Sequence, residues 1–379
     1  MKVGILTLPL WHNYGGILQA YALRLAVEEL GHEAIFIDVK RDPLSKRKKA
    51  INQTKRWVKA KILYKLNRPY YPNEKEVKRI SANTRAFVEN NITPSSRHIK
   101  LSAVPKFAKR LDAIVVGSDQ VWRPEYCPDL KLYFLGFANK RLKKISYAAS
   151  LGTDDWRFNA KETSRFGKLI KKFDAVSVRE ESAIELIKNH MDVTARQLCD
   201  PTMLFDAKDY LKAADISADA KSGGRGIFCY VLDPKEPRMQ GLDNIGAQLN
   251  SEPFYIMPKV FDKAYTKSYD EYVFPAVEDW IKALQESDFI ITDSFHGCVF
   301  SIIFNKPFIA IANTVRGRTR FESLFKLFGL DDRLFDSVAD IDPEVLNKPL
   351  DWKKINEIRE NEKKKGFQFL MNSLDIGPK

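Results

Sequence analysis

The fold is decided by residues 288–312, which read Asp288-Phe289-Ile290-Ile291-Thr292-Asp293-Ser294-Phe295-His296-Gly297, then seven residues from Cys298 to Phe304, then Asn305-Lys306-Pro307 and Phe308-Ile309-Ala310-Ile311-Ala312. The first part predicts a short buried strand, the second an apolar helix and the third a returning strand. A strand that stops at a helix N-terminus leaves unpaired backbone N–H groups aimed outward, where an anion fits. His296 would place a titratable ring beside that anion, so the junction predicts a functional site.

The same junction also has a simpler interpretation. Ser294 can act only as a helix cap, and His296 only as a hydrogen-bonded core residue. Of the five histidines, only His12 and His296 lie in glycine-containing loops that follow an apolar, strand-like run. Because ligand sites in α/β sheets gather at the carboxyl ends of strands, we favour a functional role for His296 and a structural role for His12.

Length and composition limit the class of protein. A chain of 379 residues exceeds what one ordinary core organises, so two domains are expected. Hydrophobic residues make up 44% of the chain, and no run approaches the roughly 20 apolar residues of a membrane span. The N-terminal pattern predicts a strand rather than a signal peptide. The four cysteines form no CxxC or Cys/His pattern, so we expect reduced thiols, a cytoplasmic protein and no metal site.

The net charge of +13 is unevenly placed. Basic residues are dense from Lys40 to Arg68, where Trp57 and Tyr64 are interleaved with them. This segment fits either a solvated helical face or attraction to an anionic partner, such as phospholipid headgroups or a diphosphate-bearing ligand. No recognised RNA- or DNA-binding motif accompanies the charge, so nucleic acid is not an expected partner.

Strand-like runs alternate with amphipathic stretches along nearly the whole chain, which predicts parallel α/β sheets. Predicted strands lie near residues 3–8, 34–38, 113–116, 144–148, 175–178, 196–198, 227–232, 254–257, 289–292 and 308–312. Predicted helices lie near residues 16–30, 74–90, 161–172, 181–188, 237–250, 276–286, 321–328 and 353–370. The expected fold is α/β, with two doubly wound, Rossmann-like domains facing a cleft. We place them at residues 1–205 and 206–345, with a helix in residues 346–379 that packs back across both.

Two loops that follow predicted strands in the first half carry polar side chains suited to lining this cleft. The first leads into a helix, and its candidate residues are His12, Asn13, Tyr14, Gly15, Gly16 and Gln19. Paired glycines let a ligand approach the backbone closely, but without a GxGxxG pattern they are weak evidence for a nucleotide. The candidate residues of the second loop are Ser118, Asp119 and Gln120. This loop fits an Asx-type turn, yet several polar groups at one strand end favour ligand contact.

Four arginines are candidates for holding an anion. Arg179 ends a predicted strand, where its guanidinium can grip a carboxylate or phosphate, or instead pair with Glu180 or Asp200. Three more lie within five residues of each other, just beyond the last predicted strand of the opening stretch: Arg316, Arg318 and Arg320. With a glycine among them, this cluster suits a dianion better than a plain surface.

With these loops assembled, the chain resembles the polysaccharide pyruvyl transferase family, from about Val3 to Leu334. The resemblance rests on Asn13-Tyr14-Gly15-Gly16-Ile17-Leu18-Gln19-Ala20-Tyr21-Ala22-Leu23, Gly117-Ser118-Asp119-Gln120-Val121-Trp122, Ser177-Val178-Arg179-Glu180, Asp200-Pro201-Thr202, Thr292-Asp293-Ser294-Phe295-His296-Gly297 and Arg320-Phe321. The order and spacing of these motifs are specific together. The resemblance implies a two-domain fold similar to GT-B glycosyltransferases. It also implies transfer of a pyruvyl group from phosphoenolpyruvate to two hydroxyls of a sugar, which makes a cyclic ketal and releases phosphate.

This chemistry assigns roles to the candidate residues. His296 would serve as general acid or base, and Asp119 would position or deprotonate an acceptor hydroxyl. The residues expected to hold the phosphate and carboxylate of the donor are Arg179, Arg320, Arg316, Arg318, Ser294 and Gly297. The residues expected to line the acceptor side of the cleft are His12, Asn13, Tyr14, Gly15, Gly16, Gln19, Ser118 and Gln120. Phosphoenolpyruvate is the expected donor substrate, and no cofactor or metal is expected.

Two other functions stay open at this point. A GT-B glycosyltransferase using a nucleotide sugar would share the architecture, but no uracil-stacking pocket or acidic ribose clamp is evident. A non-catalytic scaffold of a polysaccharide assembly complex would use the segment from Lys40 to Arg68 to dock at a membrane. For the transferase we expect a sugar acceptor, with a lipid-diphosphate-linked sugar as one form, in surface or exopolysaccharide biosynthesis. The enzyme would be cytoplasmic, with the same basic segment able to hold it at the inner face of the membrane.

Overall fold

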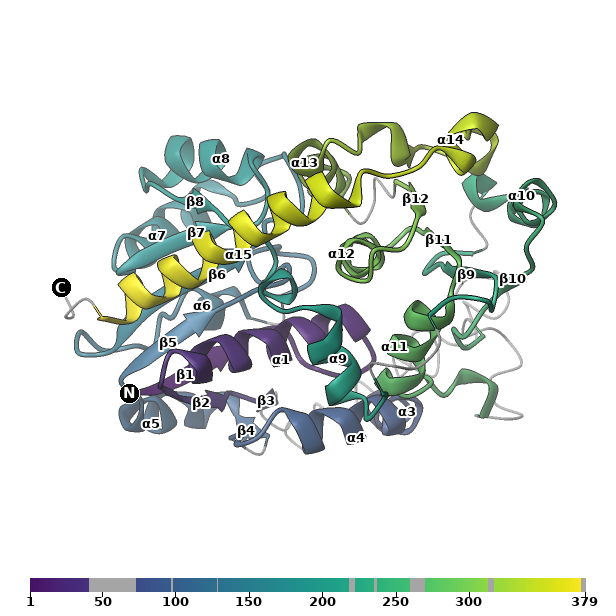
Figure 1. Cartoon of the computed structure of the whole chain (residues 1–379). Coiled ribbons are helices and arrows are strands. Elements are labelled where there is room, and N and C mark those ends of the chain that lie inside the picture. Colours follow the sequence, from purple (N-terminus) through teal and green to yellow (C-terminus); the bar gives the residue numbers. More distant parts are fainter. Residues whose placement is uncertain are drawn as a thin grey trace, which may run out of the picture.

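Two parallel sheets stand side by side in the computed structural model, each flanked by helices (Figure 1). The structure describes residues 1–40, 73–96, 98–127, 129–217, 222–234, 237–259, 270–312 and 317–375. The basic segment from Lys40 to Arg68, apart from Lys40 itself, lies outside the described residues, and so does Arg316. The roles predicted for them therefore stay predictions.

The first sheet has the strand order β2-β1-β5-β6-β7-β8 within the described part of the chain, and every pairing is parallel. Its strands are β1 (Lys2–Leu6), β2 (Glu33–Phe36), β5 (Ala113–Val116), β6 (Lys143–Ala149), β7 (Ala175–Val178) and β8 (Arg196–Gln197). The chain builds outward from β1 to β2 on one side and from β5 to β8 on the other. The strand order therefore reverses between β1 and β5, where α/β proteins commonly bind ligands.

The second sheet repeats this arrangement. In the described residues its order is β10-β9-β11-β12-β13, again all parallel, so the reversal falls between β9 and β11. Its strands are β9 (Ile227–Tyr230), β10 (Pro253–Phe254), β11 (Phe289–Thr292), β12 (Phe308–Ile311) and β13 (Leu334–Phe335). A separate short pair consists of β3 (Val39–Lys40) and β4 (Ile99–Lys100).

Several helices begin just after a side chain that caps their first turn, such as that of Asn13 or Ser294. In the first part of the chain they are α1 (Tyr14–Glu29), α3 (Glu74–Ile80), α4 (Ala82–Asn91), α5 (Val104–Phe107), α6 (Leu130–Tyr133), α7 (Ala160–Ile170) and α8 (Ser182–Met191). In the second part they are α9 (Ala207–Ala213), α10 (Leu242–Leu249), α11 (Val277–Glu286), α12 (Phe295–Ile303), α13 (Thr319–Phe328), α14 (Pro343–Asn347) and α15 (Trp352–Asp375). The helix predicted over residues 74–90 is two helices that meet at Ser81, whose backbone has left the helical conformation. No helix among the described residues is both long enough and apolar enough to cross a membrane.

Two aspartates tie β9 to β11 at both ends. Asp288, just before β11, accepts hydrogen bonds from the N–H groups of Gly224 (2.6 Å) and Gly226 (3.0 Å). Asp293, just after β11, accepts hydrogen bonds from the N–H groups of Leu232 (2.7 Å) and Asp233 (3.1 Å). Each carboxylate satisfies two backbone donors that the strands leave unpaired. The loop after β9 is thereby fixed beside the turn that leads from β11 to His296.

The largest hydrophobic core runs from one sheet to the other. It includes Val3 of β1, Tyr14 of α1, Trp280 of α11 and Phe300 of α12. The ring of Tyr14 stacks on Trp280 with centroids 5.6 Å apart, and Trp280 packs edge-on against Phe300 at 4.9 Å. Shared burial of this kind holds the two sheets in one orientation. This core includes residues from both sides of residue 205, so it does not mark a boundary there. The domain limits expected from the sequence stay a prediction.

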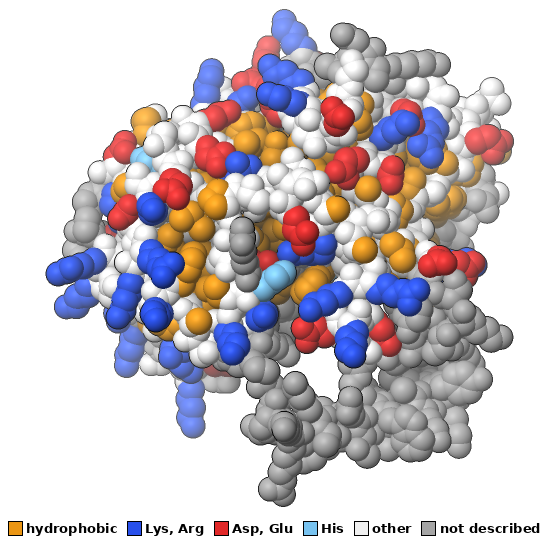
Figure 2. Space-filling model, turned by 90° about the horizontal axis from the view of Figure 1, so that it is seen from below, with side chains coloured by type: hydrophobic (Ala, Val, Ile, Leu, Met, Phe, Trp, Pro, Cys, Tyr) orange, Lys and Arg blue, Asp and Glu red, His pale blue; other side chains and the backbone are white. Residues whose placement is uncertain are grey.

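One face of the molecule carries both basic and acidic side chains (Figure 2). On the face seen from below, lysine and arginine side chains are numerous at the left, on the side of the first sheet, with hydrophobic side chains exposed between them (Figure 2). Acidic side chains are scattered over the same face. The described residues on this face therefore mix charge signs.

The C-terminal helix α15 runs back over the first sheet and ends near the N-terminus (Figure 1). Gly366 lies at a tight contact, because a Cβ atom there would lie 2.4 Å from the hydroxyl of Tyr147 and 2.6 Å from a methyl group of Leu204. Tyr147 belongs to β6, and its side chain is fully buried. The absence of a side chain at Gly366 therefore sets how closely α15 docks.

We predict that Gly366→Ala lowers the free energy of unfolding by about 1–3 kcal/mol, since the added methyl group overpacks this contact. Gly167→Ala is the matched control, because Gly167 is also a buried helical glycine but its Cβ would lie 3.7 Å from the side chain of Met191, an ordinary contact. That variant should gain roughly 0.5–1 kcal/mol from helix propensity. Urea unfolding measures both, and equal stabilisation of the two variants would contradict the docking described.

Candidate active site

The loops that follow β1, β5, β9 and β11 meet around a cavity of about 110 Å³. The loops after β1 and β5 contribute Leu8, Asn13, Asp119, Gln120 and Tyr126. The loops after β9 and β11 contribute Leu232 and residues 293–296, and α13 contributes Arg320. The points at which the two sheets reverse their strand order thus face each other across one cavity. This is the position at which open α/β sheets bind ligands.

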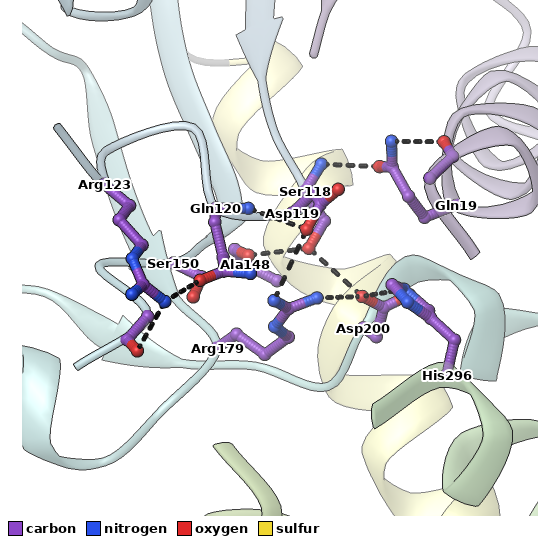
Figure 3. Close-up of polar contacts among 12 residues, drawn as sticks. Gln19, Ser118, Asp119, Gln120, Arg123, Ala148, Ser150, Arg179, Asp200 and His296 are labelled. Carbon is purple, nitrogen blue, oxygen red and sulfur yellow. Dashed lines mark hydrogen bonds and ion pairs between the residues drawn. The ribbon is translucent and has the colours of Figure 1, made fainter. Parts of the chain in front are cut away.

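A buried carboxylate, that of Asp200, connects residues of both sheets beside this cavity (Figure 3). Its Oδ2 accepts hydrogen bonds from Nη1 of Arg179 (2.8 Å) and Oγ of Ser118 (3.2 Å), and it lies 3.4 Å from Nε2 of His296. Its Oδ1 accepts hydrogen bonds from the N–H (3.1 Å) and hydroxyl (2.8 Å) of Thr202. Figure 3 shows Arg179 and His296 on either side of Asp200.

The charge of Asp200 is stabilised by its partners. Burial alone would raise the pKa of this carboxyl group, but its interactions with His296 and Arg179 hold that pKa well below the ordinary value. Asp200 is therefore ionised throughout the neutral pH range. Its negative charge fixes the guanidinium of Arg179 on one side and faces the imidazole on the other.

Arg179 keeps donors for a ligand even though it pairs with Asp200. Its Nε and Nη2 are buried and have no hydrogen-bond partner among the described residues, although Nη2 lies 3.8 Å from Oδ1 of Asp119. The guanidinium carbon lies 4.4 Å from the ring centre of Phe295. A buried N–H group without an acceptor lowers the stability of the folded protein. An oxyanion bound here would supply the missing acceptors. The two roles predicted for Arg179, pairing with a neighbouring carboxylate and binding an anion, are therefore compatible.

Arg320, from the first turn of α13, approaches the same phenylalanine ring. Its guanidinium carbon lies 5.5 Å from the ring centre of Phe295. Burial, and next the positive charge of Arg179, lower the pKa of Arg320 to about 10. The cationic form is thus destabilised by desolvation and by its neighbour, and a bound anion would offset both effects.

His296 lies in the first turn of α12 and packs against α1. Ser294 caps α12, with its Oγ accepting a hydrogen bond from the N–H of Gly297 at 3.4 Å. A Cβ atom at Gly15 would lie 2.1 Å from Cγ of the His296 ring. Gly15 therefore makes room for the imidazole, and its contact with a ligand stays a prediction. A Cβ atom at Gly297 would lie 2.2 Å from Oγ1 of Thr292, so this glycine likewise makes room for a neighbouring side chain.

Among the residues predicted for the acceptor side, Asn13 and Gln120 line the cavity. Gln19 is fully buried instead, donating hydrogen bonds to Oγ1 of Thr7 (2.9 Å) and the carbonyl of Gly16 (2.8 Å). Its Oε1 accepts a hydrogen bond from the N–H of Ser118 at 2.8 Å. Gln19 and Ser118 thus hold the loops after β1 and β5 together behind the cavity.

Four further candidates, Tyr14, His12, Arg318 and Gly16, lie away from the cavity lining. Tyr14 packs in the core and donates its hydroxyl hydrogen bond to the carbonyl of Pro275 at 3.0 Å. The ring of His12 stacks on Phe274 with centroids 4.5 Å apart. Arg318 forms ion pairs with Glu322 at 2.7 Å and with Asp336. Gly16 is a helical residue whose N–H donates to the cap Asn13 at 3.1 Å. Contact of these residues with a substrate stays a prediction.

Sequence reasoning missed three features of the site. Phe295 was not singled out, although two guanidinium groups lie near its ring. Glu180 is fully buried, and its Oε1 accepts hydrogen bonds from the hydroxyl of Ser150 (3.0 Å) and the N–H groups of Leu151 (2.7 Å) and Gly152 (2.9 Å). Tyr126 borders the cavity from the loop after β5. The sequence offered only one sign of these three residues, which is that each comes shortly after a predicted strand.

The described residues contain no cluster of three or more histidine, cysteine, aspartate or glutamate side chains arranged to hold a metal ion. The expectation that the chemistry needs no cofactor stays a prediction.

Two facing parallel α/β sheets with a cavity between their strand ends define the GT-B class of fold. The chain belongs to the polysaccharide pyruvyl transferase family, whose family model matches residues 13–314. One similar solved structure is a Listeria monocytogenes protein assigned as a UDP-N-acetylglucosamine 2-epimerase, with 13% identity, a TM-score of 0.51 and coverage of 100% of this chain and 92% of that one. Another is UGT89C1 of Arabidopsis thaliana in complex with UDP-L-rhamnose, with 12% identity, a TM-score of 0.52 and coverage of 99% of each chain. At these identities the likeness shows the fold alone. No curated protein matches the sequence significantly.

We predict that His12 makes stability depend on pH. Burial lowers the pKa of His12 to about 4 from the ordinary 6.5, so the unfolded chain binds a proton between these values and the folded protein does not. Stability is therefore full above pH 6.5 and falls as the pH drops toward 4, by about 2 kcal/mol between about pH 7.5 and about pH 5. Urea unfolding at the two pH values should show a smaller loss in His12→Phe, and an equal loss in variant and wild type would remove His12 as the cause.

Proposed function

We propose that this protein transfers a pyruvyl group from phosphoenolpyruvate onto two hydroxyls of a sugar, forming a cyclic ketal in surface or exopolysaccharide biosynthesis. The observation that carries the proposal is the pair of buried guanidinium groups, of Arg179 and Arg320, next to the imidazole of His296. Membership of the polysaccharide pyruvyl transferase family supports the same reaction. A donor with both a phosphate and a carboxylate matches two cations better than a neutral sugar does.

The donor would sit against Phe295, between the two arginines. Arg179 offers its Nε and Nη2 hydrogens, which lack acceptors in the described residues. Arg320 is a buried cation whose pKa is lowered by burial and by the charge of Arg179, so a bound anion would stabilise its charged form. The N-terminus of α12, capped by Ser294, adds the positive end of a helix dipole on the same side.

The reaction requires one proton to reach the enol carbon of the donor and two to leave the acceptor hydroxyls. In the proposed sequence His296 protonates the methylene carbon, which generates an oxocarbenium-like centre that the first sugar hydroxyl attacks. Asp119, which lines the cavity, accepts the proton of that hydroxyl. The bond from carbon to the phosphate oxygen then breaks, and the second hydroxyl closes the ketal. Its proton returns to His296, and the proton on Asp119 leaves with the phosphate.

We predict that His296→Ala lowers the rate of phosphate release from phosphoenolpyruvate by roughly 10²–10⁴, the usual contribution of one general acid–base group. The assay combines the enzyme, phosphoenolpyruvate and a panel of aryl-tagged or lipid-linked galactosides, mannosides and glucosides. It follows both free phosphate and the pyruvyl mass increment on the sugar. His190→Ala is the control, because His190 is an exposed histidine of α8 outside the cavity.

Other outcomes would redirect the proposal. A folded His296→Ala variant with nearly full activity would remove His296 from the chemistry. Release of a nucleotide from a UDP- or GDP-sugar, without phosphate release from phosphoenolpyruvate, would identify a glycosyltransferase instead. Binding to an assembly complex with no turnover of any acceptor would favour a scaffold.

A further inference from the structure

Tyr126 is an unusually exposed aromatic residue at the edge of the cavity. Its side chain is 40% exposed, and it borders the cavity together with Asp119, His296 and Arg320. In the described part of the chain, the other exposed large hydrophobic residues are Met1, Tyr255 and Met371, and none of them lines this cavity. An exposed aromatic ring at the edge of a polar cavity offers an apolar face to a ligand that enters the cavity.

The ring of Tyr126 is held in place from one side. The guanidinium carbon of Arg123 lies 4.3 Å from the ring centre, which is cation–π distance. Arg123 is itself anchored, since it donates hydrogen bonds to Oε1 of Gln120 (2.8 Å), Oε2 of Glu125 (3.3 Å) and the carbonyl of Gly152 (3.5 Å). A buried, anchored cation thus backs the ring and fixes its orientation at the rim.

The remaining lining of the cavity suits a sugar ring. Leu8 and Leu232 add apolar surface from the loops after β1 and β9, and Asn13 and Gln120 add amide groups. A pyranose has one face of C–H groups, which favours an aromatic surface, and an edge of hydroxyls, which requires hydrogen-bonding partners. A sugar lying on Tyr126 would have its hydroxyl edge toward Asp119 and His296, which line the same cavity.

We infer that Tyr126 is the stacking platform that positions the acceptor sugar, with Arg123 holding its ring from behind. The inference rests on the proposed function, because it assigns the acceptor subsite of that same reaction. It adds an aromatic surface to the acceptor residues expected from residues 12–19, of which Asn13 lines the same cavity. The platform selects for a pyranose with an accessible C–H face and leaves the donor site unchanged.

The test uses Tyr126→Ala, Tyr126→Phe and, as matched control, Tyr255→Ala, whose tyrosine is 51% exposed but lies elsewhere. The probes are methyl β-galactopyranoside, methyl α-mannopyranoside and methyl β-glucopyranoside, titrated by NMR in the presence of phosphoenolpyruvate. We expect at least one glycoside to bind the wild type and to bind Tyr126→Ala roughly tenfold more weakly, as when an aromatic anchor is truncated. Tyr126→Phe and Tyr255→Ala should bind it like the wild type, and the affinity of all variants for phosphoenolpyruvate should be unchanged.

Several results would overturn the platform. These are equal glycoside binding by Tyr126→Ala and the wild type, equal weakening in Tyr126→Phe, weakened phosphoenolpyruvate binding in Tyr126→Ala, or no binding of any glycoside to the wild type. Failure of the proposed reaction looks different. In that case the wild type releases no phosphate from phosphoenolpyruvate, while glycoside binding still depends on the ring of Tyr126.

Discussion

The site depends on a buried carboxylate placed between two sheets. Asp200 is enclosed by protein, and a lone ionised carboxylate in that position would be strongly unfavourable. It is stabilised because Arg179, Ser118 and Thr202 donate hydrogen bonds to it and because the imidazole of His296 lies 3.4 Å away. The same contacts orient the side chains that the proposed chemistry uses. A change in the placement of the two sheets would separate His296 from Asp200, so the fold and the site are constrained together.

The geometry around Asp200 comes from short polar loops on rigid strand ends. Each sheet reverses its strand order at the point where it faces the other, which brings loops far apart in sequence around one cavity. Gly15 lets α1 approach α12 closely enough for the imidazole to fit, and the continuous core fixes that approach. The two arginines then flank Phe295 from separate elements, one after β7 and one in α13. The affinity of this protein for an anion held by both arginines would therefore depend on how the two sheets are placed.

Much of the fold could be predicted from the sequence because its inner strands are short apolar runs bounded by polar loops. The strands over residues 113–116, 175–178 and 289–292 begin and end as predicted. The two-residue strands β3, β4 and β13 were not predicted, since so few residues show no periodicity. For the site, the sequence singled out His296 and Arg179 as candidates but left open whether Arg179 holds an anion or pairs with Glu180 or Asp200. Only three-dimensional packing shows that Asp200 is the partner and that Gly15 accommodates a ring.

The most direct test of this account is a crystal structure of the protein with phosphoenolpyruvate bound and no acceptor present. The account predicts that phosphate or carboxylate oxygens lie within hydrogen-bonding distance of Nε or Nη2 of Arg179 and of the guanidinium of Arg320. It also predicts that the methylene carbon of the donor lies next to the imidazole of His296. Phosphoenolpyruvate bound without contact to either arginine, or with its methylene carbon far from His296, would contradict the central claim.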